Sequence, residues 1–506
     1  MDINLFDLSG GINQSTTKIE LGITSRKICW ADSKNVELYN NKGIIRQKGN
    51  TLFIELPDSE PVAQLCQIEA DSELKLVIIT LSGKIYVYDD KTRALTTVNK
   101  TLTGTKPIVV PFLRGVIISS ETDSMCYLKN NANYDVVELT VYDLDGNILY
   151  PDFITVHKGR VWCAKGSTLY YSAIGSYSDF TTPDDAGYIN DFHTDTADIV
   201  SMQSYKDYLA IYKRERVYLL SGSNPEDFSV VLFADKGLSA PKVVINVDNK
   251  QYFLSNGIYA LEQVGELNQI RLGSEISGNI CYEFENFDKS RLNKSFVVHY
   301  PKKHQVWFFI PYFDETYYHR VLINDYLNYC WYIRVIPQNI TCACLFNNYI
   351  LSADNEGKIY IEDSGATFDG APVEFMWKSP FLSMGNVLHR KLIDEFYFVL
   401  DDVQDNNFKF SIYKDYDGEY KEDSEIISSK HYSHFMWSGE TTPDTAQYKW
   451  SDGVSPSPVW PVTTDVMEKA EICGSNLSVQ LCVEGSEVTD NCAIIGLQFR
   501  EIYDDD

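Results

Sequence analysis

The chain of 506 residues has no long apolar run and few basic residues for its size. No stretch of about 18 apolar residues occurs, so we predict no membrane-spanning helix. The first residues, MDINLFD, have neither a basic region nor a long apolar core, so we expect no secretory signal. Lys and Arg number 44 against 71 Asp and Glu, a net charge of −27. This charge excludes a protein that grips nucleic acid by neutralising phosphates, because that requires clustered Lys and Arg.

Cysteine pairs of the C-x-x-C type are also missing. There are 11 Cys, and only Cys342 and Cys344 lie close together in the sequence. This pattern is typical of buried free thiols in a protein that folds in a reducing cytosol. A disulfide framework is the alternative.

The sequence contains none of the common motifs of enzyme active sites. It has no phosphate-binding loop, no dinucleotide-binding fingerprint, no zinc-protease motif and no nucleophile elbow. His431 and His434 could both ligate a metal, but no third ligand completes a set nearby. We therefore predict no catalytic residue, no cofactor and no metal. The acidic pairs Asp89-Asp90, Asp184-Asp185 and Asp401-Asp402 are expected on solvated turns, whereas a glycoside hydrolase would need two convergent carboxylates.

Aromatic and apolar residues are plentiful instead. With 44% hydrophobic residues, 34 Tyr and 25 Phe, the composition excludes a disordered chain and favours β-structure. A pattern of two β-rich runs around a turn recurs along the chain, and several turns contain glycine, as in Ser82-Gly83, Lys165-Gly166, Asn256-Gly257 and Glu356-Gly357. The copies span residues 76–88, 115–128, 160–171, 208–220, 251–261, 305–333 and 349–361.

The copies begin about every 40 to 50 residues, the length of a four-stranded propeller blade. A blade cannot bury its own faces, but blades stacked around an axis can. We therefore predict an all-β fold with a β-propeller of six or seven blades, and interpret each visible copy as the second hairpin of its blade. Generic hairpins in a large sandwich are the alternative.

The ends of the chain do not fit the repeat. Residues 1–60 are predicted to close or decorate the propeller, which occupies 61–370, and the N-terminal part could supply an outer strand that closes the ring. Strand-like runs between 371 and 506 predict a C-terminal β-sandwich-like domain. A long irregular insertion, 415–461, interrupts it, and such segments are often functional.

Two segments are candidates for partner contacts. The stretch 177–193 is rich in aromatic and acidic residues and either covers blade edges or meets a partner. The insertion carries tryptophans that could act as sugar platforms. The candidate residues are Tyr177, Phe180, Asp184, Asp185, Tyr188, Trp437, Trp450 and Trp460.

Several motifs, in order along the chain, resemble the tail nozzle proteins of short-tailed bacteriophages, known as tail tubular protein B or packaged-DNA stabilisation proteins. The resemblance covers most of the chain, and the insertion 415–461 is the part that it leaves out. The matching runs are FDLSGGIN at 6–13, the segment 35–49 with Gly43, Arg46 and Gly49, GRVWCAKGSTLYYS at 159–172 with GSYSDF at 175–180, KGLSAP at 236–241, and WKSPF at 377–381 with HRKLIDEFYFVL at 389–400.

The resemblance implies a structural virion component without enzymatic activity. Six copies would form a ring below the portal and adaptor proteins, around the channel through which double-stranded DNA leaves. Tail fibres or tail-tip and needle proteins would be further partners. The protein would be made in the host cytoplasm and would reside in the tail of the virion.

The charge suggests a mechanism for such a duct. Six copies at −27 each would bring about −160 charges to one ring, and a negative wall would keep DNA from sticking. The alternatives are a carbohydrate- or receptor-binding propeller adhesin and, from another class, a propeller-type glycoside hydrolase.

Overall fold

The computed structural model describes residues 3–15, 27–70, 73–192, 195–265, 269–401, 406–417, 421–429, 466–470, 472, 476–486 and 493–505. Strands account for 53% of it and helices for 4%, which confirms the all-β class. None of the helices in these ranges is long and apolar enough to cross a membrane. The chain forms two compact units, one of residues 50–329 and 335–369 and one of 1–49, 330–334 and 370–506.

Seven antiparallel sheets in the described residues form the blades of a β-propeller, in agreement with the predicted fold. Each contains four main strands, which follow chain order in the first six blades, and the seventh is extended by the short β33 (Thr367–Phe368) and β34 (Ala371–Pro372). The first three blades comprise β6 (Val62–Ala70), β7 (Glu73–Thr80), β8 (Lys84–Asp89) and β9 (Ala94–Thr101); β10 (Ile108–Phe112), β11 (Gly115–Ser119), β12 (Cys126–Leu128) and β13 (Val136–Glu138); and β14 (Phe153–His157), β15 (Arg160–Lys165), β16 (Thr168–Tyr171) and β17 (Gly187–Ile189).

The fourth to sixth blades follow the same order. They comprise β18 (Ile199–Tyr205), β19 (Tyr208–Lys213), β20 (Val217–Ser221) and β21 (Ser229–Ala234); β22 (Val244–Val247), β23 (Lys250–Leu254), β24 (Ile258–Val264) and β25 (Gln269–Leu272); and β26 (Phe296–Tyr300), β27 (Gln305–Phe309), β28 (Arg320–Asp325) and β29 (Cys330–Val335). The helices in the described residues are short turns in the connections: η1 (Pro225–Asp227), η2 (Gly278–Ile280), α2 (Cys281–Glu285), η3 (Leu292–Lys294) and η4 (Pro301–Lys303).

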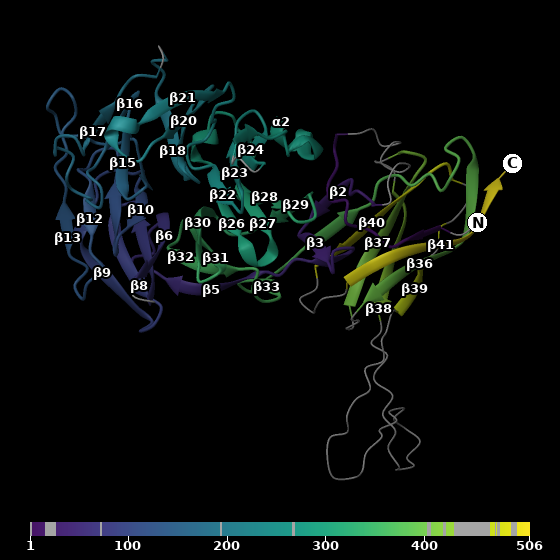
Figure 1. Ribbon diagram of the computed structural model, residues 1–506. Coiled ribbons are helices and arrows are strands. Elements are labelled where there is room, and N and C mark those ends of the chain that lie inside the picture. The colour runs from purple at the N-terminus through teal and green to yellow at the C-terminus, as the bar shows by residue number, and fades with distance from the viewer. Residues whose placement is uncertain are drawn as a thin grey trace, which may run out of the picture. The chain divides into compact units, whose positions relative to one another are not determined.

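An N-terminal strand completes the seventh blade. This blade contains β30 (Ile340–Phe346), β31 (Tyr349–Asp354) and β32 (Lys358–Glu362), and its fourth strand is β5 (Asn50–Glu55), paired antiparallel with β32. The first strand of each blade lies beside the first strands of its two neighbours, and β30 returns to β6, so the ring closes around these seven inner strands. In Figure 1 the labels β6, β10, β22 and β30 lie nearer the middle of the propeller than β9, β13 and β17.

The blades are held together by strands that are apolar on both faces. Leu76 and Ile78 of β7 pack in a cluster with Phe346 and Leu351 of the seventh blade. Val77 and Ile79, the alternate residues of the same strand, pack in a cluster that includes residues of the second blade. All four β7 side chains are fully buried, as the uniformly apolar run LVIITL predicts.

The visible sequence copies fall on the second and third strands of each blade, not on the second hairpin that we predicted, and the copy 305–333 also runs into the fourth strand, β29. The copy 76–88, for example, covers most of β7 and all of β8 except its last residue. These middle strands are buried on both sides and carry the strong apolar signal. The inner strand and the outer edge strand of a blade are partly exposed, so their sequences look like ordinary polar strands.

Glycine permits three of the four predicted turns through a positive φ. Gly83, Gly166 and Gly357 have φ values of 87°, 55° and 79°. Gly257 does not adopt a positive φ, and its reason is space: an added Cβ would lie 2.5 Å from a carboxylate oxygen of Glu275.

The other unit contains two sheets that form the predicted β-sandwich-like domain. Phe396 and Phe398 of one sheet pack against Phe410 of the other, with ring centroids 5.6 and 4.9 Å apart. One sheet contains β1 (Ile3–Leu5), β3 (Val36–Tyr39), β4 (Gly43–Arg46), β41 (Ala493–Asp505), β36 (Arg390–Asp401) and β39 (Val466–Ala470). The second contains β2 (Asp32–Lys34), β35 (Phe375–Lys378), β40 (Val479–Gly485), β37 (Asn406–Lys414) and β38 (Lys421–Ser429).

Two expected boundaries differ from the structure. Residues 1–49 group with the sandwich unit, because β3 and β4 join its first sheet and β2 joins its second. The expected irregular insertion 415–461 contains a regular strand at its start, β38, which pairs along its length with β37. The sequence KEDSEIISS hides this strand because it has only two large apolar residues. Residues 430–461 lie outside the described ranges.

A buried histidine gives the propeller a testable pH dependence. His157 ends β14 and is 3% exposed, with Nδ1 2.8 Å from the Ser204 hydroxyl of the next blade. Burial, assisted by the nearby Lys158 charge, lowers its pKa to about 4. Between that pKa and the ordinary 6.5, the unfolded chain binds more protons than the folded one, so the free energy of unfolding falls as pH falls.

We expect the wild type to lose about 2 kcal/mol more stability than His157→Gln when pH drops from 7 to 5. Urea unfolding of both proteins at the two pH values measures this difference. Equal losses in the two proteins would contradict the assignment of a buried neutral histidine.

Candidate functional site

The structure divides the predicted partner loop into packed and exposed parts. Tyr177 stacks on Tyr127 with ring centroids 4.0 Å apart, and Phe180 packs partly buried against the same apolar cluster of the second and third blades. Asp184 and Tyr188 are exposed, and Tyr188 lies on β17, so part of the expected loop is a strand. His193, the last residue of the stretch, lies outside the described residues.

Asp185 has a structural partner. Its Oδ1 lies 2.6 Å from Nη2 of Arg160, whose side chain is almost fully buried. The Arg160 guanidinium also donates to the carbonyl of Ser172 at 2.9 Å. The Ser172 hydroxyl accepts from the Val161 amide and donates to the carbonyl of Ser176. These bonds fix the loop between β16 and β17 onto β15, so Asp185 serves the fold of the third blade.

Trp437, Trp450 and Trp460 lie outside the described residues, as do His431 and His434. In the ranges that the structure does describe, no three His, Cys, Asp or Glu side chains gather closely enough to hold a metal ion. The described cysteines are free thiols, most of them buried or half-buried, with Cys281 exposed.

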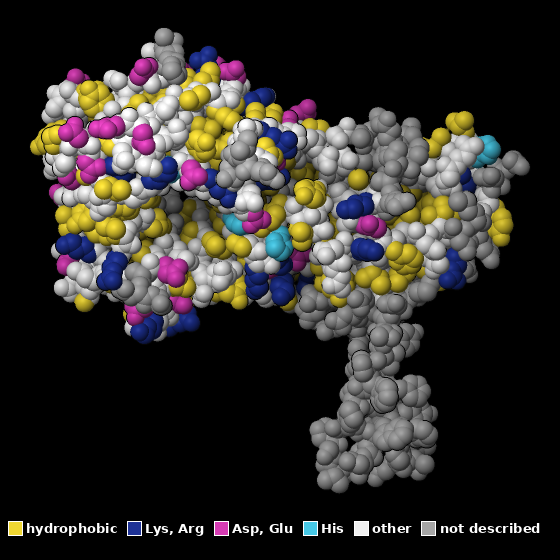
Figure 2. Space-filling view, viewed as in Figure 1, with side chains coloured by type: hydrophobic (Ala, Val, Ile, Leu, Met, Phe, Trp, Pro, Cys, Tyr) yellow, Lys and Arg dark blue, Asp and Glu magenta, His cyan; other side chains and the backbone are white. Residues whose placement is uncertain are grey.

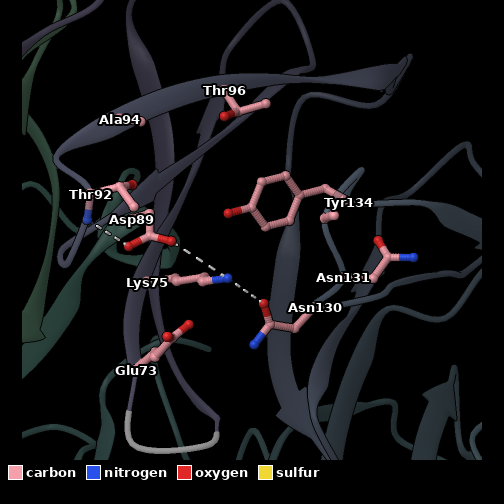
Figure 3. Close-up of a pocket in the computed structure, with 10 residues that line it drawn as sticks. Glu73, Lys75, Asp89, Thr92, Ala94, Thr96, Asn130, Asn131 and Tyr134 are labelled. Atoms are coloured by element: carbon pink, nitrogen blue, oxygen red, sulfur yellow. Dashed lines mark hydrogen bonds and ion pairs between the residues drawn. The ribbon is translucent and has the colours of Figure 1, made fainter.

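A polar pocket between the first and second blades is the candidate site (Figure 3). It is a hollow of about 330 Å³, at the lower end of the size of small-ligand sites. Lys75 and Tyr134 are buried at its base, 8% exposed each. Thr92 and Thr96 of the first blade and Asn131 of the second form an exposed rim.

Lys75 connects the two sides of the pocket. Its Nζ donates to Oδ1 of Asn130 at 2.7 Å and lies 3.7 Å from Oδ2 of Asp89. It also sits 5.1 Å from the centre of the Tyr134 ring, a cation–π distance. In Figure 3 the Tyr134 hydroxyl points into the space between Thr96 and Asp89.

The Asp89 carboxylate of the pocket is held in the charged form. Burial raises the pKa of Asp89, but hydrogen bonds from the Thr92 and Lys91 amides and the charge of Lys75 lower it by more, so the net shift is downward. Glu73 accepts from Nζ of Lys91 at 2.8 Å. A general acid for glycoside hydrolysis needs a raised pKa, so Asp89, whose pKa is lowered, is suited to binding and not to proton transfer.

Sequence reasoning missed this pocket. Its residues come from four separate strands and turns between 73 and 134, and none forms a local motif. The one signal was Asp89-Asp90, which we expected to be a solvated acidic turn.

Lys242 forms a hydrogen bond across the central tunnel of the propeller. Lys242 lies two residues before the start of β22, the inner strand of the fifth blade. It donates to Oε1 of Gln64 on β6, the inner strand of the first blade, at 2.7 Å. These blades are not neighbours in the ring, so the bond crosses the tunnel. The Lys242 side chain is exposed to solvent.

The family-like motifs lie at junctions of the fold. In KGLSAP, a Cβ on Gly237 would lie 2.2 Å from the backbone of Arg214, and the Leu238 amide donates to the Lys213 carbonyl, so the run fixes the crossing from the fourth blade to the fifth. In WKSPF, Trp377 is fully buried and the Ser379 amide donates to the Leu481 carbonyl of the sandwich.

The N-terminal motifs also lie at junctions between chain segments. In FDLSGGIN, Gly11 has φ 64°, and a Cβ there would lie 2.6 Å from Cys330. The next residue, Ile12, donates its amide to the Trp331 carbonyl. In the segment 35–49, the Gly49 carbonyl accepts from the buried Arg334 at 2.9 Å. These residues therefore specify architecture.

No family model and no curated protein matches the chain. Solved β-propellers are similar in structure. Virginiamycin B lyase from Staphylococcus aureus has 12% identity and a TM-score of 0.43, with 62% of this chain and 98% of that one covered. The WD40 propeller of Doa1 has 11% identity, a TM-score of 0.40 and coverages of 62% and 96%. The propeller of Cps50 (Swd1) from Myceliophteria thermophila has 8% identity, a TM-score of 0.42 and coverages of 62% and 99%.

Proposed function

We propose that this chain is a structural subunit of the tail nozzle of a short-tailed bacteriophage. Copies form a ring, six by the resemblance, below the portal and adaptor, around the duct through which DNA leaves. The protein retains and then releases the genome without enzymatic activity. It is made in the host cytoplasm and resides in the virion tail, where tail fibres or tip and needle proteins are further partners.

The observation that carries the proposal is the position of the family-like motifs. Gly11, Gly49, Gly237 and Trp377 each lie where two chain segments pass in close contact. Residues of this kind specify a backbone path. A sequence resemblance that includes such residues supports a shared architecture, and the role of that architecture in the family is structural.

The contact between Lys242 and Gln64 supports a duct outside the propeller tunnel. The major groove of duplex DNA alone is about 12 Å wide, so a duplex does not fit an opening that Lys242 and Gln64 bridge. The DNA duct must therefore be enclosed by several copies, which makes a ring a requirement of the proposal.

The net negative charge of the chain is compatible with a duct wall along which DNA passes without binding. In the view of Figure 2, Asp and Glu are interspersed with Lys and Arg over the visible face of the propeller. A wall with net negative charge repels phosphates at distances within a Debye length, about 8 Å at physiological salt. The hypothesis is that acidic residues line the lumen of the assembled ring; a neutral or basic lumen, with acids only outside, would contradict it.

Assembly on the portal tests the proposed function. We expect negative-stain images of the purified chain, mixed with the portal–adaptor complex encoded in the same genome, to show a ring seated on the adaptor. The adaptor complex alone, and the same complex with an unrelated propeller, serve as controls. A chain that stays unbound at saturating concentration would contradict the proposal.

A further inference from the structure

We propose that the pocket between the first and second blades binds a neutral saccharide unit. This inference does not rest on the nozzle proposal, since it follows from the pocket alone. The hollow of about 330 Å³ opens between exposed Thr92 and Thr96 on one side and Asn131 on the other. Its buried base of Lys75 and Tyr134 gives it a fixed shape.

The charges of the pocket neutralise each other. Lys75 is matched by Asp89 at 3.7 Å, and Glu73 is matched by Lys91 at 2.8 Å. The Lys75 ammonium is further engaged by Asn130 and by the Tyr134 ring. An anionic ligand would have to displace one of these partners, so a ligand without net charge fits better.

Several hydrogen-bonding groups remain for a ligand. Within the described part of the chain, no hydrogen bond is made by the hydroxyls of Thr96 and Tyr134 or by Nδ2 of Asn130, although other groups of the same residues are engaged. These donors and acceptors line one small hollow (Figure 3). Closely spaced hydroxyls that both donate and accept are the chemistry of a sugar ring, and they match this set.

Bound sugar would stay intact. The Asp89 carboxyl, with its lowered pKa, cannot act as the acid that protonates a glycosidic oxygen. Its oxygens, already oriented by Lys75 and by the Thr92 amide, can accept from sugar hydroxyls. The pocket is thus a recognition site, suited to attachment to a glycan.

Saturation-transfer NMR on the full chain tests the inference. The probes are glucose, galactose, N-acetylglucosamine and rhamnose, with inorganic phosphate as a competing anion. We expect transfer to at least one sugar, unaffected by phosphate. Tyr134→Phe and Thr96→Val should each weaken that binding about fivefold, since each removes one hydrogen bond.

Thr97→Val is the matched control, because Thr97 is the next residue of β9 and does not line the pocket. It should bind like the wild type, and melting temperatures should confirm that all three variants fold. Absence of transfer to all four sugars would overturn the proposal, as would displacement of the sugar by phosphate or an equal loss in Thr97→Val.

Discussion

Replacing Val77 with Asp is expected to prevent the propeller from folding. Val77 is fully buried in β7, in a cluster that joins the first and second blades, and Ile79 two residues along has the same environment. A carboxylate at this position would have no partner. Burying an unpaired charge destabilises the folded state by roughly several kcal/mol. A domain is typically stable by only about 5–15 kcal/mol. Ile79→Asp should behave in the same way.

Soluble yield and circular dichroism melting measure this effect. Val77→Ala, which removes volume without adding charge, should cost only about 2–3 kcal/mol and remain folded. Thr97→Asp places the same charge on the exposed outer strand β9 and should have little effect. A soluble Val77→Asp protein that melts with the wild type would contradict the position of β7 between two blades.

Removing one charge from Asp185 is expected to destabilise the third blade by about 2–3 kcal/mol. The Asp185→Asn variant leaves the buried guanidinium of Arg160 without its anion at 2.6 Å. Breaking a buried ion pair costs about 3–5 kcal/mol, and we expect less here because Asp185 is 34% exposed.

The neighbouring Asp184 provides a matched control, because it is exposed and Asp184→Asn removes the same charge. That variant should unfold within about 0.5 kcal/mol of the wild type. Urea unfolding compares the two, and limited proteolysis should cut the loop 172–186 faster only in Asp185→Asn. Equal stabilities of the two variants would contradict the buried ion pair and would return Asp185 to the set of partner residues.

The sequence predicts the propeller through one strand pair per blade. Runs such as LVIITL in β7 are apolar at every position because both faces meet another blade, and no polar alternation obscures them. The outer strand β9, ALTTVNKT, faces solvent along much of its length and has no comparable signal. The inner strand β22 has only four residues.

The pocket is harder to predict for a different reason. Tyr134 and Lys75 are separated by 58 intervening residues and meet only because two blades stack. Stacking is a property of the whole ring, so no local pattern marks the residues that converge. The sequence around Asp185 suggests a binding site where the structure shows a structural ion pair. Its acidic and aromatic neighbours resemble a binding loop, but its partner is the buried Arg160 in the preceding hairpin.

A cryo-electron microscopy reconstruction of the chain bound to its portal–adaptor complex tests the central claim most directly. The account predicts six copies around one duct wide enough for duplex DNA, with acidic side chains on its wall and the tunnel of each propeller closed by Lys242. A bound complex in which the copies enclose no such duct, or in which the duct wall is basic, would contradict it.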